Sequence, residues 1–183
     1  MINTGWQFDD FVAGACFHSR TRTITEADIV NFAGLSGDFI ELHVSDTHAS
    51  RTPHGRRIAH GALVFSIATG LSAQMNLVNE IVVAFAGVDH LRFIEPVFIG
   101  DTLKITKRVL DRREMSNDRG LLRFDTRVLN QHERAVLAYV DKLLVARTWP
   151  RNTDDRTCLN SGEDCQDEVA VPAGSRERGT CDG

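Results

Sequence analysis

One stretch of the sequence decides the fold: Ile58-Ala59-His60-Gly61-Ala62-Leu63-Val64-Phe65-Ser66-Ile67-Ala68-Thr69-Gly70-Leu71. The apolar character continues to about Met75, and no charged residue follows His60 within this stretch. A segment of this length and composition predicts an α-helix over residues 58–75 that is buried on most sides. The flanking segments must then supply the elements that cover it.

Four segments with strand character follow this helix. They are residues 81–94, 102–110, 121–129 and 135–147. The first is rich in Val and Phe, and the others alternate apolar and polar residues or contain β-branched side chains. Gly100-Asp101 and Asp118-Arg119-Gly120 supply turns, and Gly87 marks a bend or bulge. A long helix followed by antiparallel strands predicts an α+β fold in which the sheet wraps around the helix.

A strand and a shorter helix precede the long helix. Residues 15–24 alternate roughly and predict the strand. Thr25 is expected to cap the helix, because acidic residues occupy the turn that follows it and the helix dipole favours acids there. Gly34 and Gly37 are expected to end this helix and to lead the chain into a loop over residues 38–43.

Charge and composition divide the chain at Pro150. The 183 residues carry a formal net charge of −4, and the segment beyond Pro150 holds eight acids and four arginines, so it accounts for the whole excess. Its polar composition predicts a disordered acidic tail over residues 151–183, after a single domain over residues 1–150. The domain is neutral overall and no basic face is implied, so nucleic acid is not expected as a partner.

We identify no targeting or membrane-spanning segment in the sequence. The first residues lack a basic segment and an apolar core, so they do not resemble a signal peptide. No apolar run is long enough to span a bilayer, and no membrane partner is expected. The spacing of the four cysteines does not resemble a zinc site. A cytoplasmic location is therefore the expectation.

The loop before the long helix carries the candidate catalytic residues. Asp38 and His43 place a carboxylate and an imidazole five residues apart, and Gly61 lies at the entry to the apolar helix. An acid, a base and a free backbone N–H are the groups needed to move protons and water around a carbonyl compound. A structural alternative stays open, in which Asp38 caps a turn and His43 is a partly buried core histidine.

At these residues the chain resembles the MaoC-like (R)-specific enoyl-CoA hydratase and acyl dehydratase family. The resemblance covers about residues 8–148 and rests on residues 24–28, 32–38, 57–61 and 96–103, together with His43. The family pattern is Gly-Asp-x-Asn-Pro-x-His with a small residue six positions later. Gly37, Asp38, His43 and Ala49 match it, whereas Ile40 and Glu41 replace the Asn and Pro.

The resemblance implies a hot-dog fold, in which a curved antiparallel sheet wraps a long central helix. It also implies a homodimer or a higher homo-oligomer, with the acyl thioester in a tunnel at the dimer interface. Asp38 and His43 would activate water for the reversible hydration of a 2-enoyl thioester, and Gly61 would offer its N–H to the thioester oxygen. Thr69 matches the place of a frequent serine. No metal or cofactor is implied beyond the coenzyme A or acyl-carrier thioester itself.

Several assignments remain open at this point. Glu41 either points to solvent or, with Ile40, tunes the substrate. His60 either contacts substrate or makes a hydrogen bond at the helix entry. Arg56 and Arg57 either bind coenzyme A phosphates or form a solvated pair. The alternative functions are a hot-dog thioesterase, which commonly needs an acid on the central helix that this chain lacks, and a non-catalytic acyl-binding subunit.

Overall fold

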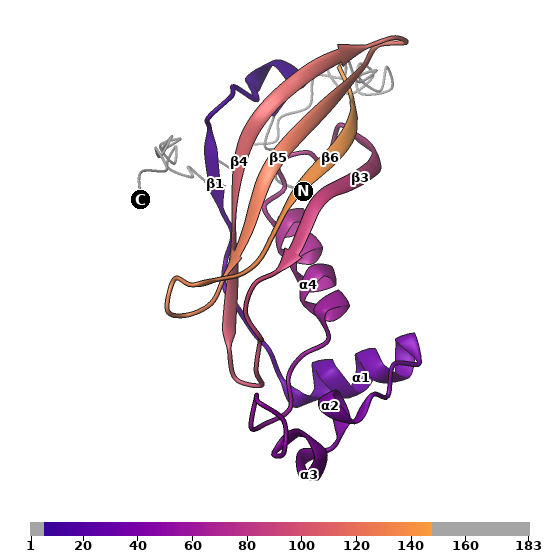
Figure 1. Cartoon of the computed structure of the whole chain (residues 1–183). Coiled ribbons are helices and arrows are strands. Elements are labelled where there is room, and N and C mark those ends of the chain that lie inside the picture. Colours follow the sequence, from indigo (N-terminus) through magenta and orange to yellow (C-terminus); the bar gives the residue numbers. More distant parts are fainter. Residues whose placement is uncertain (1–5, 148–183) are drawn as a thin grey trace, which may run out of the picture.

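Six strands form one curved antiparallel sheet in residues 6–147, the part of the chain that this computed structural model describes (Figure 1). They are β1 (Cys16–His18), β2 (Arg22–Thr23), β3 (Val82–Phe93), β4 (Thr102–Met115), β5 (Arg119–Leu129) and β6 (Ala135–Ala146). The strand order is β1-β4-β5-β6-β3, and β2 pairs with the start of β4. The predicted meander therefore holds for β4, β5 and β6, whereas β3 pairs with β6 and forms an edge of the sheet.

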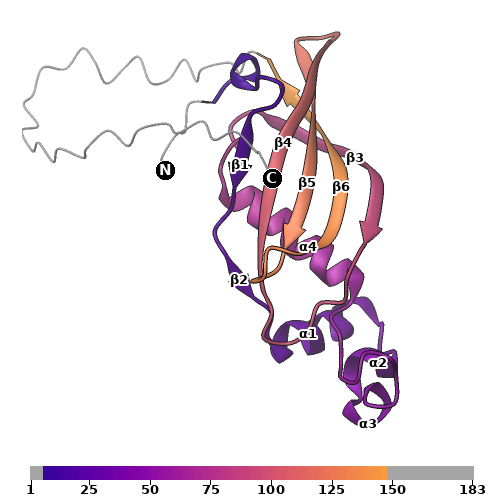
Figure 2. The ribbon, with the colours of Figure 1, turned by 60° about the vertical axis from the view of Figure 1, so that its left-hand side comes forward.

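Helix α4 is the one that packs on the inner face of this sheet in the described part of the chain. They are the short 3-10 helix η1 (Phe8–Asp10) and the helices α1 (Glu26–Ser36), α2 (Glu41–Val44), α3 (Asp46–Ala49) and α4 (Gly61–Gln74). Helix α4 lies along the sheet, and α1, α2 and α3 gather near the N-terminal end of α4 (Figures 1 and 2). A long helix enclosed by a curved antiparallel sheet is the hot-dog arrangement, so the predicted α+β fold is confirmed.

Helix α4 begins later than predicted and is buried on one face only. Residues 58–60 are extended, because the N–H of Ala59 donates to the carbonyl of Val97 over 2.7 Å and Ile58 forms a bridge with Phe98. The buried face consists of Leu63, Val64, Ile67, Ala68 and Leu71. The opposite face carries the small or polar residues Ala62, Ser66, Gly70 and Ala73, all exposed. The expectation of burial on most sides is therefore wrong for the single chain.

Other boundaries also differ from the sequence prediction. The strand predicted over residues 15–24 is interrupted, because Ser19 bonds to both backbone groups of Ile105: its N–H donates over 3.0 Å and its Oγ accepts over 2.9 Å. Gly34 lies inside α1, and Gly37 alone ends that helix, with φ of 78°. Gly120 belongs to β5, and the hairpin turn is made by residues 117–118 with positive φ. Gly87 is at a bulge, as predicted.

Two hydrophobic clusters hold the layers together. One lies between α4 and the sheet and includes Leu63, Ile67, Ile105, Val128 and Leu137. The other lies at the far end of the sheet, where Phe8 and Phe11 of the N-terminal segment pack with residues such as Val109, Leu122 and Phe124. Burying an apolar side chain of this size stabilises the fold by about 1.5–3 kcal/mol. The inward positions of the strands alternate with outward polar ones, which is the pattern that predicted them.

An ion pair is buried among these apolar residues. Nζ of Lys107 on β4 lies 2.6 Å from Oδ2 of Asp141 on β6 and 3.0 Å from Oγ of Ser72 on α4. The hydroxyl of Thr126 on β5 donates to the other oxygen of Asp141 over 2.5 Å. The lysine and aspartate side chains are only 3% and 2% exposed. Three strands and α4 therefore share one buried polar network.

Replacing Gly120 with alanine is expected to destabilise the protein by about 1–3 kcal/mol or more. A Cβ at this position would lie 2.2 Å from the ring of Phe8, which is 1% exposed and packed in a hydrophobic cluster. Chemical denaturation measures the change. The matched control is Gly34→Ala, where nothing lies within 4 Å and the helical position should gain about 0.5–1 kcal/mol. Equal behaviour of the two variants would contradict the prediction.

Two expectations concern the chain as a whole. The predicted disordered tail, residues 151–183, lies outside the described residues. Within residues 6–147, no helix combines the length and the apolar character that crossing a membrane requires.

Candidate active site

Helix α1 precedes the first candidate residue, Asp38, and both of its ends are capped. Oγ1 of Thr25 accepts the N–H of Asp28 over 3.2 Å, and Oδ2 of Asp28 accepts the N–H of Thr25 over 2.8 Å, which is a capping box. Burial raises the pKa of Asp28, but the hydrogen bonds from Thr25 and the ion pair with Arg22 outweigh it and hold that pKa below its usual value. At the other end, Gly37 adopts the left-handed conformation that turns the chain out of the helix.

Asp38 follows this turn and is held through its backbone. Its side chain is half-buried, and Oδ1 accepts the N–H of Ile40 over 3.3 Å. The backbone carbonyl of Asp38 accepts a hydrogen bond from Nε2 of His60 over 3.0 Å. The carboxylate therefore keeps its second oxygen for other partners.

His43 lies on the short helix α2 and is 9% exposed. Its Nδ1 lies 2.8 Å from the carbonyl oxygen of Ile58. A carbonyl can only accept a hydrogen bond, so Nδ1 carries the proton in this contact. In the neutral ring, Nε2 then holds a lone pair, and the imidazole is set up to act as a base through that atom.

His60 joins the two candidate residues. Its ring stacks on that of His43 with 3.9 Å between centroids, and its Nε2–H holds the carbonyl of Asp38. The side chain is 2% exposed, and within residues 6–147 its Nδ1 has no hydrogen-bond partner. The hydrogen bond of His60 thus reaches back to the loop that carries Asp38, a contact that the sequence did not reveal.

A pocket of about 490 Å³ opens beside His43 and the start of α4. Its lining consists of His43, His54, Ile58, Ala59, Gly61, Ala62, Val64, Phe93, Ile94, Glu95, Pro96, Val97 and Val136. Gly61 is the first residue of α4, where backbone N–H groups have no acceptor within the helix. A Cβ on Gly61 would lie 2.8 Å from the ring of Phe93, so any larger residue there would require that ring to move. An imidazole and a helix N-terminus therefore share one largely apolar pocket.

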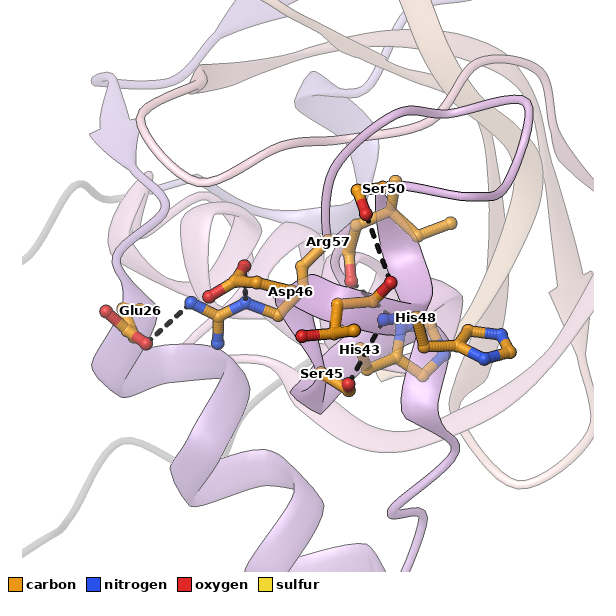
Figure 3. Close-up of polar contacts among 9 residues, drawn as sticks. Glu26, His43, Ser45, Asp46, His48, Ser50 and Arg57 are labelled. Atoms are coloured by element: carbon orange, nitrogen blue, oxygen red, sulfur yellow. Dashed lines mark hydrogen bonds and ion pairs between the residues drawn. The ribbon is translucent and has the colours of Figure 1, made fainter.

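Arg57 fixes the elements around this pocket. Figure 3 shows its guanidinium between Glu26 of α1 and Asp46 of α3, each 2.7 Å away. Hydrogen bonds to Glu26 and then to Asp46 raise the pKa of Arg57, which stays charged. Through Nε and one terminal nitrogen, this arginine therefore ties the loop before α4 to α1 and α3.

Comparison of the chain with known proteins identifies its family. The model of the MaoC like domain matches residues 12–128. The chain belongs to the MaoC-like domain family. Protein MaoC from Klebsiella aerogenes is 41% identical over 98 residues, which is 54% of this chain and 29% of that protein. The chain therefore spans less than a third of that relative's length.

Two further relatives match larger shares of their own length. An (R)-specific enoyl-CoA hydratase from Rhodospirillum rubrum is 38% identical over 103 residues, covering 56% of this chain and 68% of that protein. The structure of a monoamine oxidase regulatory protein from Archaeoglobus fulgius superposes with a TM-score of 0.73 at 36% identity, covering 78% of this chain and 95% of that one. The MaoC-like family includes hydratases and dehydratases, so the resemblance identified from the sequence is confirmed at this level.

The residues that depart from the MaoC-like pattern lie outside the pocket. The side chain of Ile40 is exposed, and neither Ile40 nor Glu41 is among the lining residues. Glu41 is exposed too, with Oε2 3.3 Å from Nδ1 of His48 on α3. Thr69 lies about two turns along α4 from Gly61 and donates its hydroxyl to the carbonyl of Ser66. The backbone of Ile40 does contact the site, since its N–H donates to Asp38 and its carbonyl accepts the N–H of His43.

Asp38, His43 and His60 are also the described residues that could hold a metal ion. One ligand atom from each lies within 4.8 Å of the other two. Ligand atoms in a tetrahedral zinc site are about 3.4 Å apart, and their lone pairs converge on one point. The 4.8 Å limit on the separations in this group is wider than that spacing.

Proposed function

We propose that this chain catalyses the reversible hydration of a 2-enoyl thioester to a 3-hydroxyacyl thioester. The observation that carries the proposal is the shared pocket, where His43 and the N-terminus of α4 at Gly61 face one apolar space. The family membership supports a hydro-lyase, and the hydratase from Rhodospirillum rubrum is the relative whose printed activity matches. The acyl chain would occupy the apolar part of the pocket, beside Val64, Phe93 and Val136.

His43 lines the pocket, and Asp38, which does not line it, has a carboxylate oxygen within 4.8 Å of a ring nitrogen of His43. The oxygen of a water molecule bonds to the β-carbon of the enoyl group, and one of its protons passes to the Asp38–His43 pair. The same pair then delivers a proton to the α-carbon, so the C=C bond becomes a C–C bond with no change in redox state. Negative charge develops on the thioester oxygen meanwhile, and the N–H at Gly61 with the helix dipole would stabilise it.

The alternatives predict different products. A thioesterase would release a free thiol, and a non-catalytic acyl-binding subunit would leave the thioester unchanged. No acidic residue lies on α4, which disfavours the hydrolytic alternative. The test is a panel of 2-enoyl thioesters, monitored by loss of enone absorbance and, in parallel, by thiol release. Loss of absorbance without thiol release supports the proposal, whereas thiol release or no reaction with any member contradicts it.

The open edge of the sheet supports a second copy of the chain as the partner. Among residues 6–147, no strand pairs with the outer side of β3. Apolar side chains along this strand are exposed: Val82, Val83, Phe85, Leu91 and Phe93. Phe93 is 56% exposed although its ring covers Gly61 at the pocket. A long apolar edge strand promotes aggregation unless another chain or element covers it. In the proposed homodimer, this covering would also close the pocket wall formed by Phe93.

Phe85→Glu is expected to shift the protein from a dimer to a monomer in sedimentation velocity experiments. The substitution places a charge on the exposed apolar edge, where pairing with a second copy would bury it without a partner. Leu110→Glu is the matched control, because Leu110 is exposed to a similar degree on β4, away from the β3 edge. A wild-type chain that sediments as a 20.4 kDa monomer with full activity would contradict the dimer.

A further inference from the structure

His60 contacts three segments of the candidate site, although it is not among the residues that line the pocket. Its ring stacks on that of His43 on α2 and lies 5.1 Å from the ring of Phe32 on α1, measured between centroids. Its Nε2–H donates to the backbone carbonyl of Asp38 over 3.0 Å. In the sequence, His60 directly precedes Gly61, the first residue of α4. One side chain therefore joins the segments that carry the candidate base, the candidate carboxylate and the candidate oxyanion donor.

Only one of the two ring nitrogens of His60 has a partner. The carbonyl of Asp38 can only accept, so Nε2 carries the proton, and in the neutral ring Nδ1 holds a lone pair. This Nδ1 is buried and has no hydrogen-bond partner within residues 6–147. A buried acceptor without a partner lowers stability, and proteins keep such costs mainly where function needs the residue. Packing alone would favour an apolar ring at this position, so the group that histidine adds is the Nε2–H on Asp38.

The direction of this side chain also affects the start of α4. His60 occupies the N-cap position of α4, but its side chain makes no hydrogen bond to the first turn. The residues preferred at an N-cap, such as Ser, Asp and Asn, accept a backbone N–H of that turn. Because His60 turns to Asp38 instead, it leaves the N-terminus of α4 without a side-chain cap at the point where Gly61 lines the pocket.

The bond to Asp38 restrains a short series of contacts that ends at His43. Oδ1 of Asp38 accepts the N–H of Ile40 over 3.3 Å, and the carbonyl of Ile40 accepts the N–H of His43 over 2.9 Å. His60 holds both ends of this series, since it bonds to the backbone of Asp38 and stacks on the ring of His43. Loss of the bond would therefore free the carboxylate to move relative to the imidazole.

We propose that His60 is a positioning residue: its Nε2–H bond to the Asp38 carbonyl sets the separation between the Asp38 carboxylate and the His43 ring. This inference rests on the proposed hydratase function and assigns His60 no contact with the substrate. A displacement of about 1 Å in a reacting group can lower a rate by about 10²-fold. The loss of the bond should therefore lower kcat and leave KM nearly unchanged.

Two substitutions separate the hydrogen bond of His60 from its ring. His60→Phe keeps a ring that can stack on His43 but has no N–H, so kcat for an enoyl thioester should fall by about 10²-fold, with KM changed by about twofold or less. His60→Gln lacks the ring, but its amide can donate to Asp38, so its kcat should stay within about fivefold of wild type. His48→Phe is the matched control and should keep both constants, because His48 is exposed on α3 and contacts Glu41 instead.

Three kinetic results would overturn the inference: wild-type kcat in His60→Phe, a loss expressed mainly in KM, or an equal loss of kcat in His60→Phe and His60→Gln. If His60→Phe does not fold, His60→Gln decides alone. A kcat near that of wild type then supports the role of the hydrogen bond, and a loss of about 10²-fold overturns it.

Hydrogen exchange at the backbone N–H groups of Ile40 and His43 gives a readout without turnover. Exchange should be about tenfold faster in His60→Phe and near the wild-type rate in His60→Gln. Unchanged exchange in His60→Phe would overturn the inference even if kcat falls. A wild-type chain that hydrates no enoyl thioester, but in which His60→Phe accelerates this exchange, would refute the proposed function and leave the restraint by His60 standing.

Discussion

Asp38→Asn and His43→Asn are each expected to lower the turnover of an enoyl thioester by about 10³-fold, with little change in thermal stability. Asp38→Asn preserves the size of the side chain and the bond from Ile40, so it removes the charge alone. His43→Asn keeps an N–H near the position of Nδ1, which can still donate to Ile58, but it removes the base at Nε2. Enone absorbance measures the rate, and differential scanning calorimetry measures the stability.

The double variant separates a shared role from two independent ones. Residues that act on one water as a unit are strongly non-additive, so the double variant should be little slower than either single variant. Glu41→Gln is the control, because Glu41 lies close in sequence yet points to His48. If Asp38→Asn kept most of the turnover but melted far lower, Asp38 would be a structural residue of the turn, and the proposed chemistry would fail.

Lys107→Ala is expected to destabilise the fold by about 3–5 kcal/mol, because it leaves the charge of Asp141 buried without its partner. The charge sits between strands β4, β5 and β6 and helix α4, and water has almost no access to it. Urea denaturation measures the change. The double variant Lys107→Met with Asp141→Leu removes both charges and fills the space, so it should recover most of the loss.

A surface pair on the same sheet provides the comparison. Lys142 lies 2.7 Å from Asp89, but both side chains are partly exposed to water. Lys142→Met should therefore cost far less stability than Lys107→Met, although both pairs have short contacts. Equal losses in the two variants would show that burial does not decide the energy of the Lys107 pair.

The sequence predicted the elements better than it predicted their ends and pairings. The apolar run of α4 and the alternation in β4, β5 and β6 follow from burial, so they were readable from residue order. The start of α4 could not be predicted in this way, because residues 58–60 are held extended by Val97 and Phe98, which come later in the chain. The burial of Lys107 could not be predicted either. Alternation alone does not show that an inward position holds a charge paired with Asp141, which is distant in the sequence.

In the candidate site, too, some residues could be predicted from local motifs, whereas the contacts between elements could not. Asp38, His43 and Gly61 were predicted as site residues because short motifs carry them. The structure places Asp38 beside His43, and His43 and Gly61 in one pocket. The stack of His60 on His43 and its bond to Asp38 depend on how α2 and α4 meet, which no local pattern encodes. Phe93 was missed for the same reason, since its contact with Gly61 spans two elements. A glycine at a helix start was the only signal that something approaches closely there.

The pairing of β1 with β4 has a consequence for synthesis of the chain. Cys16 pairs with Arg108, so the N-terminal segment finds its partners only after most of the domain has been made. Phe8 and Phe11 likewise pack on β4, β5 and β6. The hairpins from β4 to β6 are local and should form early, whereas the N-terminal segment should dock late. During synthesis this aromatic segment emerges before β4, β5 and β6, so its apolar side chains stay exposed until those strands are made, and a chaperone would protect it during that interval.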